Sequence, residues 1–179
     1  MLRITIPSNE FWDERTEEFV YTKEYTLELE HSLLSLSKWE SKWCKPFLSN
    51  VELTDEEALD YIRCMTITKN VDPEVYSLLS IDNLRDINNY ISAPMTATTV
   101  NERNQRGSKE IVTAEIIYYW MVSLNIPFEC QKWHLNRLLM LIKVCTIKNE
   151  PAKKMNKRDV MKQNAALNAA RKKKLNTTG

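Results

Sequence analysis

The residues best suited to chemistry lie in one short stretch that contains Glu129, Cys130 and His134. A thiol with a nearby base, and a carboxylate that orients the base, is the arrangement of a nucleophilic catalyst. A spacing of four residues also places two metal ligands on one face of a helix. However, the stretch lacks an elbow motif that would present a nucleophile, and it falls where a helix is expected to start. We therefore expect these side chains to pack rather than to catalyse.

A metal site at Cys130 and His134 would need two further ligands. Tetrahedral sites of cysteine and histidine usually contain a second close pair. The other candidates, His31, Cys44, Cys64 and Cys145, are scattered along the chain. The cysteines are those expected of an intracellular protein with reduced, mostly buried thiols. The sequence thus predicts no catalytic residue, no metal and no cofactor, and the protein is expected not to be an enzyme.

The scarcity of glycine excludes whole classes of binding site. Gly107 and Gly179 are the only glycines, and neither a Walker-type loop nor a dinucleotide-binding turn can be built from one internal glycine. Asparagine is the next residue to tolerate the left-handed conformation that ends many helices. Asn50, Asn70, Asn125 and Asn149 all follow apolar-periodic stretches. We expect helices joined by turns that Asn and Pro mark.

Two segments near the start of the chain alternate with period two. Residues 2–6 read as a short strand that ends before Pro7. Residues 19–29 alternate similarly, and they are expected either to pair with the first strand or to form a hairpin around Thr22-Lys23-Glu24. No stretch approaches the roughly 18 apolar residues that cross a bilayer, nor does the start resemble a secretory signal. No membrane contact is expected.

From His31 onward the apolar spacing becomes helical. One helical stripe is formed by Leu33, Leu36, Trp39, Trp43 and Phe47. A capping box at Thr54 and Glu57 predicts the next helix; others are expected from Asp72, after a cap at Asp82, from Ser108 or Lys109, from about Lys132 to Lys148, and in the tail. The last two before the tail are expected to be central to the core. The predicted fold is mainly α (α+β): residues 1–150 form one helical bundle-like domain with a small β element in 1–30, and 151–179 form a basic C-terminal helical tail.

Aromatic residues suggest contact surfaces near the start. Trp39 and Trp43 alternate with lysines, so they either pack in the core or form an exposed platform that stacks on nucleic-acid bases or on a partner. Phe11 and Trp12 stand in a charged segment and are expected at an interface. Residues 11–30 are therefore a candidate partner-binding segment.

The charge of the chain is divided unevenly. Residues 151–179 hold nine Lys and Arg against one acid, a balance of +8, and subtracting this from the formal charge of +1 leaves −7 for residues 1–150. The candidate partner-binding cations are Lys153, Lys154, Lys157, Arg158, Lys162, Arg171, Lys172, Lys173 and Lys174. Such a tail is a solvated end, a nucleic-acid contact or a protein contact. Protein contact fits best, because copies of a chain with opposite charges at its two ends can associate head to tail.

Four segments carry a resemblance to small proteins of tailed bacteriophages. They are Leu29–Leu48 (LEHSLLSLSKWESKWCKPFL), Asp60–Met65 (DYIRCM), Ile126–Leu138 (IPFECQKWHLNRL) and the ending Leu167–Asn176. On these segments the chain resembles the tail assembly chaperones of long-tailed phages. We know of no catalytic motif in that family to transfer to this chain.

The resemblance implies a mainly helical protein that acts in the cytoplasm of the infected host. Several copies would coat the tape-measure protein and recruit the tail-tube protein until the tube displaces them. Two other functions stay open: a structural or connector protein of the virion, and a regulator that binds nucleic acid.

Overall fold

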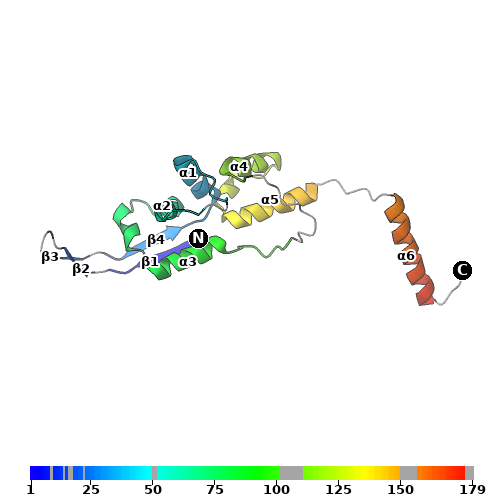
Figure 1. Ribbon diagram of the computed structural model, residues 1–179, viewed down its shortest axis with the longest axis horizontal. Coiled ribbons are helices and arrows are strands. Elements are labelled where there is room, and N and C mark those ends of the chain that lie inside the picture. The colour runs from blue at the N-terminus through cyan, green and yellow to red at the C-terminus, as the bar shows by residue number, and fades with distance from the viewer. Residues whose placement is uncertain are drawn as a thin grey trace. The chain divides into compact units, whose positions relative to one another are not determined.

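The computed structural model describes residues 1–8, 10–13, 15, 18–21, 23–49, 52–100, 111–149 and 157–175, with the backbone alone at 11–13, 18, 20, 21 and 159. Contacts divide the chain into a compact unit, Met1–Ile147, and a second unit, Lys148–Gly179. The elements are β1 (Leu2–Ile6), β2 (Glu10–Asp13), β3 (Glu18–Tyr21), β4 (Tyr25–Leu29), α1 (Leu33–Trp43), α2 (Asp55–Met65), the 3-10 helix η1 (Pro73–Leu78), α3 (Ile81–Ser92), α4 (Ala114–Ser123), the 3-10 helix η2 (Phe128–Lys132), α5 (Leu135–Asn149) and α6 (Lys157–Leu175) (Figure 1). The predicted mainly helical fold with a small N-terminal β element is confirmed. Among the described residues, no helix is both long enough and apolar enough to cross a bilayer.

The β element consists of two antiparallel strand pairs. Strand β1 pairs with β4 from Leu2↔Leu29 to Ile6↔Tyr25, and β2 pairs with β3. Of the two alternatives for residues 19–29, the observed one is pairing with the first strand, and residues 25–29 make it. The partner of β3 is β2, which the sequence pattern did not predict. Alternation along β1 and β4 turns Ile4, Ile6, Leu27 and Leu29 into the interior.

Two hydrophobic cores fill the compact unit. The first core joins the inward faces of β1 and β4 to Trp39 of α1 and to residues of α2, η1 and α3. The second core joins Leu33 and Leu36 of α1 to residues of α4, η2 and α5. Helix α1 therefore contributes to both cores, and Figure 1 shows it next to α2 and near α4.

Several local signals act as expected. Thr54 and Glu57 form the predicted capping box at the start of α2, and Asp72 caps η1. Asn70 and Asn125 have φ values of 55° and 53°, so asparagine takes two of the left-handed positions that glycine usually fills. Two others among the described residues belong to Cys44, which ends α1, and to Met95. The cap of α3 is Ser80 rather than Asp82, since the Ser80 hydroxyl accepts the amide of Asn83.

Helix α4 differs from its prediction in two ways. It begins at Ala114 after an N-cap at Thr113, whereas the predicted start at Ser108 or Lys109 lies outside the described residues. It is also not central, because Tyr119 and Val122 are 68% and 59% exposed while Ile117 and Met121 are buried. Helix α4 is apolar on several faces, but only one of these faces packs against the rest of the compact unit.

A buried carboxylate joins α1 to α4. Glu40 is 6% exposed, and its two oxygens accept the amides of Phe47 at 2.9 Å and Ala114 at 2.7 Å. The N-cap residue Thr113 makes no capping hydrogen bond with its own side chain. Glu40 therefore supplies the cap of α4 from another helix, where the positive end of the helix dipole favours a negative charge.

Replacing Glu40 with alanine should lower the free energy of unfolding by roughly 2–5 kcal/mol, because two buried backbone donors lose their acceptor. Urea denaturation followed by circular dichroism measures the change. Glu24→Ala is the matched control: it removes the same group from an exposed position and should change stability by less than about 0.5 kcal/mol. Equal effects of the two substitutions would show that the contact does not support the fold.

Candidate functional site

The two histidines of the chain lie side by side in the compact unit. The ring centroids of His31 and His134 are 5.1 Å apart, and both side chains are buried. Their segments are also joined through the backbone, because the Leu135 amide donates to the His31 carbonyl oxygen at 2.7 Å. His31 lies just after the end of β4, and His134 lies directly before the start of α5.

Hydrogen bonds assign the protonation state of His134. Its Nε2 lies 2.9 Å from the carbonyl oxygen of Tyr90, which can only accept, so Nε2 carries the proton. Its Nδ1 accepts the amide of Asn136 at 3.3 Å. Both ring nitrogens are thus satisfied by a neutral imidazole. Burial lowers the pKa of His134, which agrees with this neutral form.

His31 is held in a similar way. Its Nδ1 lies 2.6 Å from the hydroxyl oxygen of the buried Tyr61. Burial, with a smaller contribution from the charge of His134, lowers the pKa of His31 from 6.5 to about 4. The pair therefore serves as a neutral, hydrogen-bonded part of the interior at pH 7.

Cys130, His134 and Glu129, which were considered as nucleophile, base and orienting acid, are not arranged as a reactive set. Cys130 belongs to the second core and is 6% exposed, His134 is engaged as described, and Glu129 is exposed. Within the described ranges, no group of three or more His, Cys, Asp or Glu side chains could hold a metal ion.

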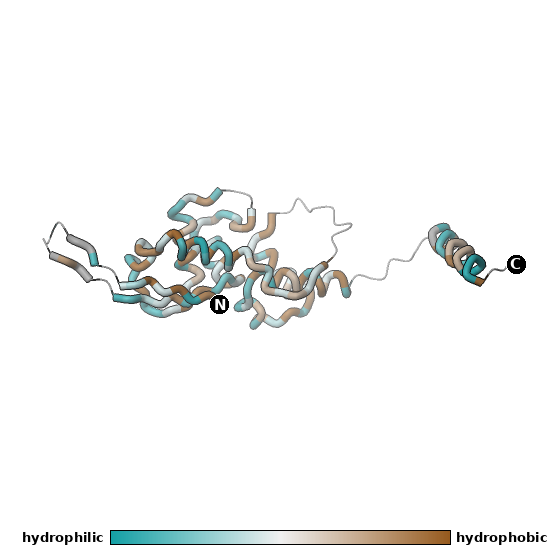
Figure 2. Tube along the Cα trace, turned by 90° about the horizontal axis from the view of Figure 1, so that it is seen from below, coloured by the Kyte–Doolittle hydropathy of each residue, from teal (hydrophilic) through white to brown (hydrophobic). Residues whose placement is uncertain are grey.

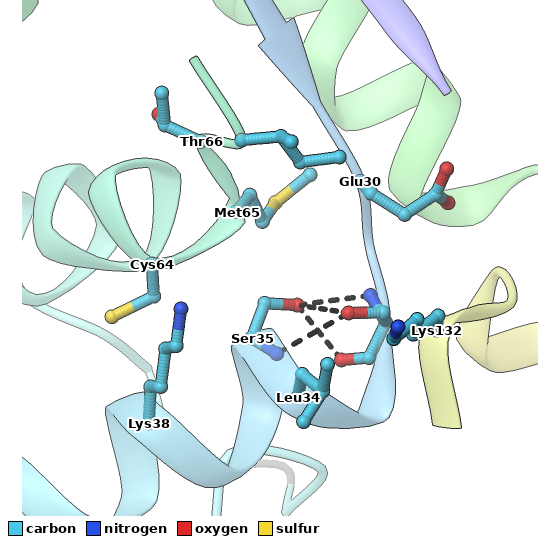
Figure 3. A pocket seen from close by; sticks show the side chains of 10 residues that line it. Glu30, Leu34, Ser35, Lys38, Cys64, Met65, Thr66 and Lys132 are labelled. Carbon is cyan, nitrogen blue, oxygen red and sulfur yellow. Dashed lines mark hydrogen bonds between the residues drawn. The ribbon is translucent and has the colours of Figure 1, made fainter. Parts of the chain in front are cut away.

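A cavity of about 410 Å³ lies between the end of β4, the start of α1 and residues 64–67 (Figure 3). The hydroxyl of Ser35 donates to the Ser32 carbonyl oxygen at 2.7 Å and accepts the Ser32 amide at 2.9 Å, the second of these bonds being part of the α1 capping box. Burial raises the pKa of the Cys64 thiol, which keeps it protonated. Neither group in this cavity is activated as a nucleophile.

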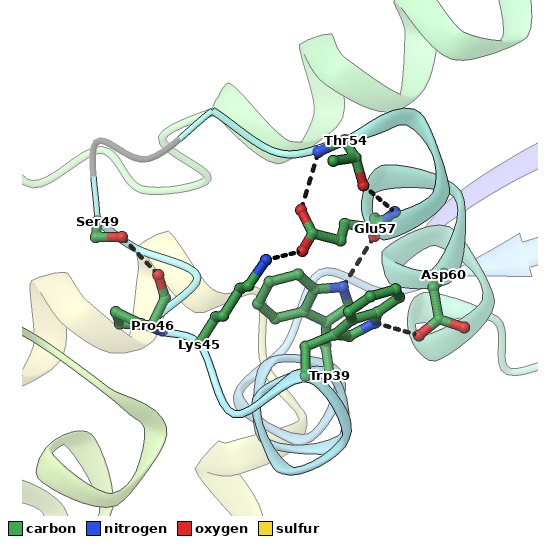
Figure 4. A network of polar contacts seen from close by, with 8 residues as sticks. Trp39, Lys45, Pro46, Ser49, Thr54, Glu57 and Asp60 are labelled. Atoms are coloured by element: carbon green, nitrogen blue, oxygen red, sulfur yellow. Dashed lines mark hydrogen bonds and ion pairs between the residues drawn. The ribbon is translucent and has the colours of Figure 1, made fainter.

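Trp39 and Trp43 belong to a polar and aromatic network between α1 and α2 (Figure 4). Trp39 is completely buried, and its indole N–H donates to the Glu57 carbonyl oxygen at 2.9 Å. Trp43 is half-buried, and its indole N–H donates to the Asp60 carboxylate at 2.9 Å. Trp39 is therefore a core residue and not a partner contact; the alternative of core packing is the correct one for it.

Two lysines of the predicted lysine–tryptophan pattern also turn toward α2. Lys42 pairs with Asp60 at 2.5 Å, and Lys45 pairs with Glu57. Although burial opposes its charge, hydrogen bonds from Lys42 and Trp43 leave the pKa of Asp60 below its ordinary value. The pattern that suggested a nucleic-acid platform thus stabilises the contact of α1 with α2.

The remaining predicted contact residues lie at the two ends of the sequence. Phe11 and Trp12 are in β2, paired with Val20 and Phe19, and their side chains lie outside the described atoms, as do Lys153 and Lys154 entirely. The other predicted cations are all on α6, where every described side chain is exposed: Lys157, Arg158, Lys162, Arg171, Lys172, Lys173 and Lys174. Helix α6 is thus a basic helix with its charges open to solvent.

Sequence reasoning missed the most consequential buried polar groups. Glu40 stands four residues after Leu36, on the apolar stripe of α1, and that position was a usable signal. The pairing of His31 with His134 had no such signal, because the two residues are brought together only by the packing of distant segments.

The buried histidines should make the fold sensitive to mild acid. As pH falls below 6.5 the unfolded chain protonates at position 31, whereas the folded chain does so only near pH 4. Stability is therefore fully present above pH 6.5 and is lost between pH 6.5 and 4, by up to about 3 kcal/mol.

Urea denaturation at several pH values, compared with His31→Gln, tests this expectation. The variant cannot take up the proton at this position, so its stability should fall less steeply over the same range, while all carboxylates titrate in both proteins. Parallel pH profiles for the two proteins would contradict the assignment of a buried neutral His31.

Comparison with known proteins adds no further constraint: no protein-family model, curated protein or solved structure matches this chain.

Proposed function

We propose that this chain is a phage tail assembly chaperone that works by binding: it would hold the tape-measure protein and recruit tail-tube subunits in the cytoplasm of the infected host. The observation that supports this proposal most strongly is α6. It is a helix of 19 residues that ends in four consecutive cations, with every described side chain exposed. It belongs to a chain whose first 150 residues carry −7.

The physics of an assembly chaperone agrees with such a helix. A chaperone must release its client when the next subunit arrives, which favours a polar contact over a large dry one. Contacts between exposed charges are weak individually and are screened by salt within about 8 Å at physiological ionic strength. A basic exposed helix provides an adhesive surface that another protein can displace.

The positions of the phage-like segments also support the proposal. In the compact unit the first of them, Leu29–Leu48, contacts both Asp60–Met65 and Ile126–Leu138, because His31 contacts Tyr61 and His134. The first segment also contains α1, which contributes to both cores. The described part of the fourth segment, residues 167–175, is the end of α6.

A pull-down with the tape-measure and tail-tube proteins of the same phage tests the proposal. The intact chain should recover at least one of them. Reversing the α6 cations at Arg171, Lys172, Lys173 and Lys174 to Glu should weaken recovery by roughly tenfold or more, the sum of several exposed pairs.

The matched control reverses four exposed lysines of the compact unit, Lys23, Lys38, Lys69 and Lys132. It changes the net charge equally and should retain binding. If the intact chain recovers neither protein, the proposal fails. Recovery of the chain in purified particles by mass spectrometry would instead make it a structural protein of the virion.

The run of four cations in α6 also favours a second candidate, nucleic-acid binding. Each phosphate contact releases counterions, so affinity for DNA would fall steeply as salt rises. Electrophoretic mobility shift across a salt series, with the intact chain and the α6 reversal, distinguishes the two. We expect only weak, non-specific retention, because α6 has no aromatic side chain to stack on bases; tight binding that the reversal abolishes would favour a nucleic-acid regulator.

A further inference from the structure

The negative charge of the compact unit is concentrated in one part of it. Residues 52–92 hold nine acids and three bases, so their balance of −6 accounts for nearly all of the −7 in residues 1–150. Two of the nine acids are paired: Asp60 with Lys42 of α1, and Glu57 with Lys45, which follows α1. The other seven are exposed: Glu52, Asp55, Glu56, Asp72, Glu74, Asp82 and Asp86. Of these, Asp82 forms an exposed pair with Arg85.

An apolar groove lies between the elements that carry these acids. Cavities of about 210 and 340 Å³ adjoin between α2, η1 and α3, and Ala58, Ile62 and Leu84 line both. Asp55 lines the larger one. On α3, Leu84 is 37% exposed and Ile81 is 78% exposed. The segment around this open apolar groove thus carries exposed acids, of which Asp55 lines the groove itself. A basic helix with apolar side chains suits such a surface.

Helix α6 has the complementary properties. Seven cations stand on it against the single acid Asp159. Its four large apolar side chains, Val160, Met161, Leu167 and Leu175, are 38%, 74%, 49% and 69% exposed. At about 100° of rotation per residue these four fall within about a third of the helix circumference, and Figure 2 shows hydrophobic and hydrophilic positions interspersed along α6. A helix with so little apolar surface is marginal alone and gains stability from a partner.

We propose that the groove between α2, η1 and α3 binds the α6 helix of a second copy of this chain. Val160, Met161 and Leu167 would enter the groove beside Ala58, Ile62 and Leu84, and the cations of α6 would face Asp55 and the other exposed acids of residues 52–92. Because the two surfaces differ, the contact is heterologous, and repeating it builds rings or filaments of copies. This inference goes beyond the proposed function, because it concerns contacts of the chain with itself.

A charge-exchange experiment with the full chain tests the proposal. The first variant reverses the α6 cations, with Arg171, Lys172, Lys173 and Lys174→Glu. The second reverses four exposed acids of α2, η1 and α3, with Asp55, Glu56, Glu74 and Asp86→Lys. Sedimentation velocity at low salt should show concentration-dependent association of the wild type that salt weakens, and monomers for each variant alone. An equimolar mixture should associate again, because each variant then meets a complementary surface.

Two leucines that are each 37% exposed provide a matched test of the apolar groove. Leu84→Ala removes a side chain that lines both cavities and should weaken association by roughly tenfold or more. Leu48→Ala removes the same group from a position that lines neither cavity and should leave association unchanged. Circular dichroism of every variant confirms that the helices are retained.

A wild type that stays monomeric at low salt would overturn the proposal, as would association that survives either reversal or a mixture that does not associate. Only this chain is present in the assay. A negative result in the sedimentation assay therefore does not bear on the tape-measure pull-down. A negative pull-down likewise does not bear on self-association.

Discussion

Helix α1 is the constraint on which the compact unit depends. Leu33 and Leu36 belong to one hydrophobic core and Trp39 to the other, so a displacement of this helix would open both at once. Glu40 adds a directional bond from the same helix to the first turn of α4. The paired His31 and its neighbours lie just before α1, so the residues around this helix couple the β element, both cores and α4 into one cooperative structure.

This arrangement leaves binding to surfaces that the cores do not need. Lys42 of α1 and Lys45 just after it pair with Asp60 and Glu57. Among the charges that remain exposed are seven acids of residues 52–92 and the described cations of α6. Opposite charge on separate parts of one chain favours attraction between molecules, with strength set by salt.

Local chemistry made part of this fold predictable from sequence. The capping box of Thr54 and Glu57 follows from hydrogen bonding within a few residues, and the positive φ of Asn70 follows from local backbone sterics. Contacts between distant residues were not predictable, such as that of Glu40 with Ala114, which lies 74 positions away. Helix α4 was misjudged because composition does not tell which apolar face meets a neighbour. The excess of acidic residues in 52–92 can be counted from the sequence. Its relation to the apolar groove cannot, because the groove forms only when the helices pack together.

We infer that α6 is stabilised when it binds a protein surface and that salt weakens this stabilisation. Hydrogen–deuterium exchange of the full chain measures this at each amide, in dilute and concentrated solution and at low and high salt. We expect the amides of α6 to exchange rapidly in dilute solution, to become protected as the protein concentration rises, and to lose that protection at high salt. The amides of α1 should stay protected under all four conditions. Protection of α6 that is independent of both concentration and salt would contradict it.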